Sequence, residues 1–375
     1  MVEWKKLGEV CKLERGVRVV KKDLQEEGQI PVYQNSLTPL GFYDKSNYPQ
    51  NTPFVICAGA AGEVGFCNKE FWAADDCTCI VCTPLVISKY VYYCLLLKQH
   101  LLKSQVRKAS VPRLSKDVIG KITIPVPSLS EQQRIVETLD TFTASIDNLK
   151  EQIAQRRKQY EHYREQLLDL EGKEGVELKT LGSLCNVVTK QTGFDYSSKI
   201  KPELMIRKVD NSVPFLQTKN FAGRKFDYNT DYYVPIHIVN QFPKIVLNEK
   251  CLLFSIVGAS IGNIGLFPGE VKCFLGGAIC VLKFKDSINI HYIYEVMSSW
   301  YGQKQIKSKT KGAGQATITV EDVRNFEIPY PKTNIQMNIV SVLDAFEASI
   351  SNLEAQLAQR QKQYEYYRNR LLTFE

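Results

Sequence analysis

Two stretches of the chain repeat one helical pattern of apolar and polar positions. In residues 135–171 apolar or aromatic side chains recur at alternating steps of three and four, from Leu139 to Leu170, and the pattern returns in residues 339–375. The stretches lie 204 positions apart and agree at 23 of 37 positions. One narrow apolar stripe with this spacing is typical of a coiled-coil seam. We predict two helices of about 40 residues, each about 60 Å long.

The residues that lead into each helix are repeated as well. Residues 124–127 (Ile-Pro-Val-Pro) precede the first helix and residues 328–331 (Ile-Pro-Tyr-Pro) precede the second. Proline ends the preceding element, and in the first copy Ser128 or Ser130 can cap the helix that follows. Each helix then carries a glutamine and an isoleucine three positions apart: Gln132 and Ile135, and Gln336 and Ile339.

The blocks between the helices resemble each other faintly. Each begins with a matching Leu-Gly segment, residues 2–8 and 176–182, and each contains a glycine turn, residues 59–62 and 258–262. Short β-branched and aromatic runs alternate with Gly and Pro turns, which predicts a mixed α/β (α+β) structure. We therefore divide the chain into two globular domains, 1–130 and 172–334, and two long helices, 131–171 and 335–375.

The spacing of the repeat predicts the topology. Only residues 172–174 separate the first helix from the second domain, and by correspondence Met1 matches Gly175 and Glu375 matches Glu171. The chain is thus nearly circularly closed, and a pseudo-twofold repeat makes the helices an antiparallel, intramolecular coiled coil. Met1 and Glu375 are expected within about 14 Å of each other.

Arginine interrupts the apolar seam once in each helix. In the predicted pair Arg156 faces Leu357 and Arg360 faces Ile153. Such a polar layer can fix the register. The arginines and their polar neighbours can also form a surface for a protein partner, or their charged heads can simply be solvated. The candidate partner-binding residues are Gln155, Arg156, Gln159, Glu161, Gln359, Arg360, Gln363 and Glu365.

Charge is distributed unevenly along the chain. The 375 residues include 48 Lys and Arg against 40 Asp and Glu, a net charge of +8. The two domains carry +5 and +7, whereas the helices carry −3 and −1. Two basic domains joined by long helices suit a polyanion with two separated sites, and double-stranded DNA meets that description.

Candidate DNA contacts fall into two classes. Basic residues late in each domain suit phosphates, whereas polar side chains at predicted loop tips suit base edges. For each of them an ordinary surface role is the competing interpretation. The candidates of the first domain are Arg15, Arg18, Lys21, Lys22, Tyr33, Gln34, Asn35, Lys103, Arg107, Lys108 and Arg113. Those of the second are Lys190, Gln191, Lys199, Lys201, Gln217, Lys219, Asn220, Lys304, Lys307, Lys309, Lys311 and Gln315.

Other chemistry has less support. No apolar run reaches the roughly 18 residues of a membrane span and the start lacks a signal-peptide core, so we predict a cytoplasmic protein with no membrane partner. Its eleven cysteines are expected as free thiols. Cys77, Cys79 and Cys82 have a spacing that zinc sites use, but a buried strand is the stronger interpretation and no metal is predicted.

The whole chain resembles the specificity (S) subunit of type I restriction-modification systems. The resemblance rests on the Pro and Gln motifs that begin each helix and on Ala-Gln-Arg-x-Lys-Gln-Tyr-Glu-x-Tyr-Arg, present at 154–164 and 358–368. It implies a non-catalytic protein with two target recognition domains on an antiparallel coiled coil. Each domain would read half of an asymmetric bipartite DNA site, with half-site centres about one duplex turn, about 34 Å, apart.

The same resemblance implies partners. Two modification (M) subunits would methylate adenine with S-adenosylmethionine, and two restriction (R) subunits would add ATP-driven translocation and cleavage with magnesium. No cofactor is expected in this chain, which has no Asn-Pro-Pro-aromatic motif and no phosphate loop. Two other classes stay open: a two-headed DNA-binding regulator or architectural protein without modification partners, and a coiled-coil scaffold.

Overall fold

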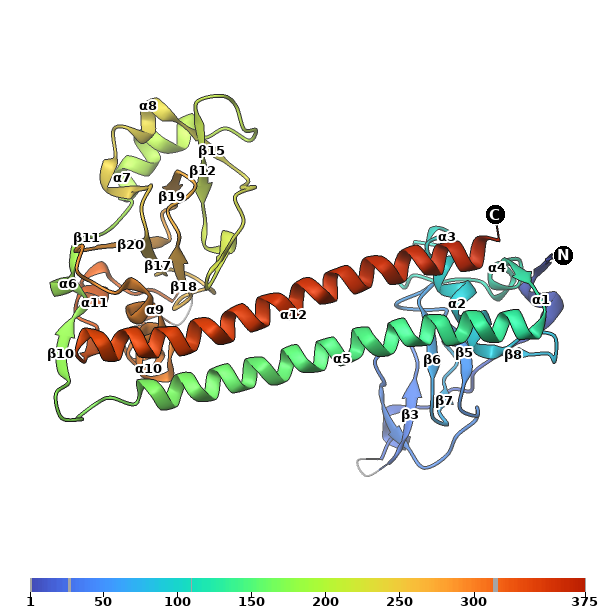
Figure 1. Ribbon diagram of the computed structural model, residues 1–375. Coiled ribbons are helices and arrows are strands. Elements are labelled where there is room, and N and C mark those ends of the chain that lie inside the picture. Colours follow the sequence, from blue (N-terminus) through green and yellow to red (C-terminus); the bar gives the residue numbers. More distant parts are fainter. Residues whose placement is uncertain (1, 26–27, 109, 313–315, 375) are drawn as a thin grey trace. The chain divides into compact units, whose positions relative to one another are not determined.

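The computed structural model describes residues 2–25, 28–108, 110–312 and 316–374, which divide into two compact units (Figure 1). Met1–Gln152 and Leu353–Glu375 form the first unit, and Ile153–Asn352 forms the second. Both boundaries fall inside long helices, so each unit combines a globular part with segments of both helices. The predicted fold class, mixed helix and sheet in two domains, is confirmed.

The first unit packs helices against strands that are antiparallel except for the parallel pair of β3 and β7. In chain order its elements are β1 (Glu3–Lys6), α1 (Leu7–Val10), β2 (Cys11–Arg15), η1 (Lys21–Asp23), β3 (Ile30–Tyr33), β4 (Gly41–Tyr43), β5 (Thr52–Ile56), β6 (Val64–Cys67), β7 (Trp72–Ala73), β8 (Cys77–Cys82), α2 (Ser88–Leu97), α3 (Gln99–Ser104), α4 (Lys116–Gly120), β9 (Thr123–Val126) and the first part of α5 (Leu129–Leu168). The main sheet has the order β2-β8-β5-β6. Helix α2 packs on this sheet and buries Tyr90, Val91 and Leu95 in the core.

The second unit has the same plan with more loop structure. It contains the last part of α5, then β10 (Glu177–Thr180), α6 (Leu181–Leu184), β11 (Cys185–Lys190), α7 (Gly193–Asp195), η2 (Tyr196–Ile200), η3 (Lys201–Glu203), β12 (Ser212–Leu216), η4 (Thr218–Asn220), β13 (Phe221–Ala222), β14 (Lys225–Phe226), β15 (Tyr233–Pro235), α8 (Ile236–Val239), η5 (Pro243–Ile245), β16 (Val246–Leu247), β17 (Cys251–Ser255), β18 (Ile264–Phe267), β19 (Cys273–Leu275), β20 (Ile279–Phe284), α9 (Ile290–Ser298), α10 (Trp300–Lys309), α11 (Val320–Arg324), β21 (Glu327–Tyr330) and the first part of α12 (Thr333–Thr373).

Strand pairing repeats between the units. The sheet β11-β20-β17-β18 matches β2-β8-β5-β6, and β10 pairs with β21 as β1 pairs with β9. Even the register agrees, since Trp4 lies opposite Pro125 and Leu178 opposite Pro329. The smaller sheets differ, because β4-β3-β7 in the first unit is replaced by β15-β12-β19-β16 in the second. The internal repeat therefore holds for the main sheets and is relaxed in the loops around them.

The long helices begin just after the prolines. Strand β9 is followed by Pro127, and α5 begins at Leu129. The hydroxyl of Ser128 accepts a hydrogen bond from the backbone N–H of Glu131 (3.3 Å), as expected of a helix cap. Neither long helix, nor any other within the described ranges, is long and apolar enough to cross a membrane.

The glutamine of each helix start has a structural role. Gln132 is fully buried; its side-chain oxygen accepts from the N–H of Ile87 (2.9 Å) and its amide nitrogen donates to the carbonyl of Pro127 (3.0 Å). Gln336 is also buried and donates in the same way to the carbonyl of Pro331 (2.9 Å). The repeated motif therefore joins each long helix to the strand before it.

Aromatic pairs define how the helices meet within each unit. In the first unit Phe142 of α5 stacks on Tyr367 of α12, with ring centroids 5.2 Å apart. In the second unit Tyr163 stacks on Phe346 at 5.3 Å. The register predicted from the sequence is wrong by one helical turn, because it would place Phe142 opposite Leu371. Large aromatic rings in the seam select the observed register, which the heptad spacing alone does not distinguish.

The C-terminal end of α12 completes the core of the first unit. Leu372, which is 1% exposed, lies in the same apolar cluster as Leu7 and Val10. The predicted closeness of Met1 and Glu375 concerns two residues that lie outside the described ranges.

Candidate nucleic-acid interface and helix contacts

A glycine turn and a basic hairpin meet in the first unit. Gly59 and Gly62 have φ values of 81° and 88°, a left-handed conformation that glycine adopts without strain. The N–H of Gly59 donates to the carbonyl of Pro112 (3.2 Å). Arg107 and Arg113 bridge each other through backbone hydrogen bonds of 2.9 and 3.2 Å. The turn thus holds a hairpin that presents two arginines.

The second unit builds the same arrangement. Gly258 and Gly262 have φ values of 89° and 84°, and the N–H of Gly258 donates to the carbonyl of Ala316 (3.0 Å). Lys311 and Thr317 bridge each other at 3.0 and 2.9 Å. The position of Arg113 is therefore taken by Thr317, and that of Arg107 by Lys311. The glycine segments are structural turns, as the sequence predicts.

Arg15 and Arg113 line one cavity of about 200 Å³ in the first unit. Lys116 adds a third cation, and Asp75 and Asp76 line the same cavity. The Nε of Arg15 donates to the carbonyl of Asp75 (2.7 Å), which fixes the guanidinium at the end of β2. The structure thus brings together Arg15, a candidate for contacts to base edges, and Arg113, a candidate for contacts to phosphates.

A cavity of about 310 Å³ lies at the corresponding place in the second unit, beyond the end of β11. Lys190 and Gln217 line it together with Tyr196 and Phe215, whose rings lie roughly parallel to each other. Its wall is therefore aromatic where that of the first unit is charged. The two units offer different chemistry at equivalent positions.

Three of the candidate DNA contacts have internal contacts that give them a structural role. Gln191 is only 3% exposed, and its amide nitrogen donates to a backbone carbonyl. Asn220 is 5% exposed, and its side-chain oxygen accepts from a backbone N–H of its own turn. Tyr33 packs its ring on Phe54 at 4.9 Å, and burial raises the pKa of its hydroxyl to about 12. These side chains support the fold, and Gln191 also lines the cavity beyond the end of β11.

The remaining DNA candidates that the structure describes are exposed or partly exposed. Some are held by acidic neighbours: Lys103 by Glu63, Lys199 by Asp195, and Lys219 by Asp231. Gln34 is half-buried. Other candidates are exposed: Arg18, Lys22, Asn35, Lys108, Lys201, Lys304, Lys307 and Lys309. The side chain of Lys21 and the whole of Gln315 lie outside what the structure describes.

The seam arginines contact aromatic rings. The guanidinium of Arg156 lies 5.9 Å from the ring centre of Phe346, and that of Arg360 lies 5.7 Å from Phe142. These contacts replace the facing residues predicted from the sequence, Leu357 and Ile153. Stacking on a ring stabilises a cation that stays partly exposed.

A polar cavity of about 280 Å³ opens between the helix segments of the first unit. Amide and hydroxyl side chains dominate its wall, so it suits polar groups of a partner better than an apolar side chain. The lining residues are Ser145, Asn148, Leu149, Gln152, Gln356, Gln359, Arg360 and Gln363. The other candidate partner-binding residues, Gln155, Gln159, Glu161 and Glu365, are exposed.

The sequence analysis missed a buried carboxylate that joins α9 to the long helices of the second unit. Glu295 is fully buried; it accepts from the hydroxyl of Tyr160 (2.8 Å) and from Arg224 (2.7 Å). Arg224 also donates to Asp344 of α12 (2.6 Å). Burial raises the pKa of Glu295, and Arg224 and Tyr160 oppose that shift. The sequence signal for this residue is a single carboxylate within the otherwise apolar run 292–297.

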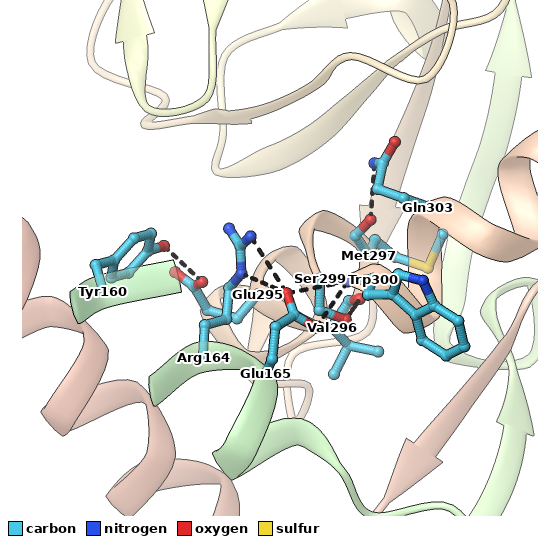
Figure 2. A network of polar contacts seen from close by, with 9 residues as sticks. All are labelled: Tyr160, Arg164, Glu165, Glu295, Val296, Met297, Ser299, Trp300 and Gln303. Carbon is cyan, nitrogen blue, oxygen red and sulfur yellow. Dashed lines mark hydrogen bonds and ion pairs between the residues drawn. The ribbon is translucent and has the colours of Figure 1, made fainter. Parts of the chain in front are cut away.

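Figure 2 shows the part of this network around Glu295, with Tyr160, Arg164 and Glu165 of α5 directed toward α9 and the start of α10. The carboxylate of Glu165 accepts from the backbone N–H of Trp300 at 2.9 and 3.1 Å. A carboxylate at a helix start stabilises the otherwise unpaired N–H groups there. Two carboxylates therefore attach α5 to the rest of the second unit. Glu295 of α9 accepts from Tyr160, and Glu165 of α5 accepts from the start of α10.

The first unit uses a simpler contact at the equivalent place. Asp140, 204 positions before Asp344, accepts from Lys89 (2.8 Å) and from the hydroxyl of Tyr93 (2.5 Å). Lys89 and Asp140 are 36% and 35% exposed, so this pair is far less buried than Glu295. An aspartate thus attaches each long helix to its domain, through different partners.

The cysteine cluster lies largely within a buried strand. Cys77 and Cys79 are buried in β8, and the thiol of Cys77 donates to the carbonyl of Gln34 (3.2 Å). Within the described ranges, no group of three or more His, Cys, Asp or Glu side chains is arranged to hold a metal ion.

Comparison with known proteins gives a consistent result. The family model for the type I restriction modification DNA specificity domain matches residues 1–156 and 173–361. The chain is 30% identical over its whole length to the specificity subunit of the type I restriction enzyme EcoR124I/EcoR124II of Escherichia coli, and the match covers 94% of that subunit. It is 24% identical to a putative type I specificity subunit of Mycoplasma pneumoniae, over 98% of this chain and 96% of that one. The crystal structure of an S subunit from M. genitalium matches with a TM-score of 0.67 and 19% identity, covering 99% of this chain and 96% of that one.

Proposed function

Because the chain belongs to the type I restriction-modification DNA specificity family, we propose that each unit reads one half of a bipartite site in double-stranded DNA. The chain itself is a non-catalytic specificity subunit of such a system. The proposal rests above all on the paired hairpins, in which a glycine turn in each unit holds basic residues, and on the cavity that Arg113 of the first hairpin lines. Arginines and lysines in such a position neutralise phosphates and place neighbouring polar groups against base edges.

The differences between the units support an asymmetric site. Arg15 and Arg113 line the cavity of the first unit, and arginine pairs well with the acceptors of guanine in the major groove. The matching cavity of the second unit offers Lys190 and Gln217 beside aromatic rings. Two surfaces with different donors and acceptors select different bases, so the half-sites should differ in sequence.

Partner docking on the long helices is the second part of the proposal. The amide-lined cavity of the first unit and the partly exposed Arg156 and Arg360 offer hydrogen bonds and positive charge to a methyltransferase subunit. Under this proposal S-adenosylmethionine is bound by the modification subunits. ATP and magnesium belong to the restriction subunits.

Methylation mapping of the host genome tests the reading of DNA. With this chain present we expect adenine methylation at one bipartite motif, and without it that methylation should disappear. Arg15→Ala combined with Arg113→Ala should relax one half-site and leave the other unchanged, since only the cavity of the first unit is altered. Loss of specificity in both halves at once, or methylation that persists without the chain, would contradict the proposal.

A paired charge reversal tests the docking surface. Arg156→Glu with Arg360→Glu should weaken binding of the methyltransferase subunit by about tenfold or more, because it replaces two positive charges at the interface with two negative ones. Lys158→Glu with Lys362→Glu is the matched control, since these lysines are exposed and occupy equivalent positions in the repeat. Co-purification and titration by light scattering measure the effect. Equal weakening by both pairs would assign the result to net charge instead.

A further inference from the structure

Two cysteines face each other across the main sheet of the first unit. Cys11 begins β2, Cys82 ends β8, and the two are direct partners in the antiparallel register. The next pair outward is hydrogen-bonded, because the N–H of Thr83 donates to the carbonyl of Val10 (3.1 Å). Cys11 and Cys82 therefore form a non-hydrogen-bonded pair, in which Cα atoms lie about 4.5 Å apart. A disulfide bridges Cα separations of about 4.4–6.8 Å, so the backbone need not move.

The two thiols are already in contact. Their sulfur atoms lie 3.6 Å apart, with Cys11 as donor and Cys82 as acceptor. Cys11 is buried, whereas Cys82 is partly exposed. The hydrogen bond from Cys11 lowers the pKa of Cys82, and the same bond together with burial raises the pKa of Cys11. The accessible sulfur is thus the one that ionises more readily, and thiolate is the reactive form.

The second unit lacks this pair, although β11 and β20 are paired antiparallel as β2 and β8 are, with a register shift after Cys185. Cys185 occupies the position of Cys11, but its register partner is Phe284. The next pair outward is again hydrogen-bonded, from the N–H of Lys285 to the carbonyl of Leu184 (3.1 Å). Burial raises the pKa of Cys185 to about 12. The repeat therefore provides an internal control, a cysteine in the same place without a second thiol.

We propose that Cys11 and Cys82 are a redox-sensitive thiol pair that a peroxide converts to a disulfide between β2 and β8. The thiolate of Cys82 attacks one oxygen of hydrogen peroxide; an S–O bond forms, the O–O bond breaks, and the departing hydroxide takes up a proton. Cys11 then loses its proton and attacks the sulfenic sulfur of Cys82, so that the S–S bond forms and the S–O bond breaks with release of water. Two thiols lose two electrons and two protons, and the peroxide becomes two waters.

The disulfide would tie together strands that are distant in the chain. Cys11 and Cys82 are 71 positions apart, so the bond closes a long loop and restricts the unfolded chain. Strand β2 also carries Arg15 at its other end, on the wall of the charged cavity. Oxidation therefore stabilises the strand pair that positions this arginine. The inference stands on the thiol geometry and does not depend on the proposed reading of DNA.

Peptide mapping of the full chain tests the pair. The protein is treated with hydrogen peroxide in slight excess, its remaining thiols are alkylated after denaturation, and the digest is analysed by mass spectrometry without reductant. We expect a linked peptide containing Cys11 and Cys82, formed before other thiols react and released by dithiothreitol. The thermal midpoint of the first unit should rise on oxidation.

Two variants complete the test. Cys82→Ser should abolish both the linked peptide and the thermal shift while leaving Cys11 free to alkylate after denaturation. Cys185→Ser should change neither. The proposal is overturned if the wild-type protein gives no Cys11–Cys82 peptide while other cysteines oxidise, or if linkages between other cysteines form at the same rate.

Discussion

Replacing Arg224 by methionine should lower the free energy of unfolding of the second unit by about 3–5 kcal/mol, the range found when one partner of a buried ion pair is removed. Glu295 has no exposed surface, and Arg224 is its cationic partner at 2.7 Å. Without the guanidinium, the carboxylate keeps its hydrogen bond from the hydroxyl of Tyr160, at 2.8 Å, and the weaker electrostatic effect of Arg164. An ionised group in that position must then either remain poorly compensated or take up a proton.

Tryptophan fluorescence measures this change in one unit at a time. Trp4 and Trp72 belong to the first unit and Trp300 to the second, so a Trp4→Phe, Trp72→Phe background reports urea unfolding of the second unit alone. Lys89→Met is the matched control, because it removes the cation that pairs with Asp140 in the first unit; it is measured in a Trp300→Phe background, in which Trp4 and Trp72 report the first unit. That pair is about one-third exposed, so the expected loss is at most about 1 kcal/mol.

The stability that Arg224→Met removes should depend on pH. Burial raises the folded-state pKa of Glu295 above 4.5, so its protonation favours the folded state. The stability from this group is fully present below its unfolded pKa and is lost as the pH rises through the folded value. The cost of Arg224→Met should therefore be small in acid and grow toward neutral pH. Combining it with Glu295→Gln should restore most of the lost stability; a cost that is the same at every pH would contradict the buried-charge explanation.

Removing the basic hairpins should weaken DNA binding strongly. Arg107→Ala with Arg113→Ala in the first unit removes two charged contacts, and at about 1.5 kcal/mol each the affinity of the assembled complex should fall about one hundredfold. If both contacts are to phosphates, the slope of log K against log salt should become shallower by about two. Lys309→Ala with Lys311→Ala should do the same in the second unit.

A salt titration of DNA binding with a matched control distinguishes specific contacts from net charge. Lys5→Ala with Lys12→Ala removes the same charge from the first unit, but these lysines already pair with Glu3 (2.9 Å) and Glu14 (2.5 Å). The control should therefore keep nearly the wild-type affinity. A control that binds as weakly as the hairpin variants would show that only total charge matters.

The sequence predicts the long helices and the mixed helix-and-strand class well because both depend on local patterns. A heptad stripe and a proline boundary lead to one structure almost regardless of context, and the observed α5 and α12 follow them. The register of the helices is different, because a shift of one turn leaves every apolar position apolar. Stacking of Phe142 on Tyr367 decides it, and that choice depends on the shapes of the rings.

The candidate site is harder to predict because residue type does not determine which side of the backbone faces solvent. Gln191 and Tyr33 belong to types that often contact DNA, yet Gln191 donates to the distant carbonyl of Leu275 and Tyr33 packs in a core. Lys219 finds an acidic partner twelve positions away, at Asp231. The role of Glu295 was not predicted, because its partner Arg224 lies in a distant loop. Burial and pairing of this kind appear only when the chain is folded.

The division of α12 between the two units affects how the protein folds during synthesis. The first unit is complete only when Leu353–Glu375 joins Met1–Gln152, and Leu372 fills a core that begins with Leu7. At about 5–20 residues per second, the ribosome needs about 10–40 s to proceed from the first segment to the second. During that interval the nascent first domain exposes apolar surface that its own C-terminus will cover. The second unit, formed from the continuous segment Ile153–Asn352, can close earlier, so the domain that is made first is the last to finish.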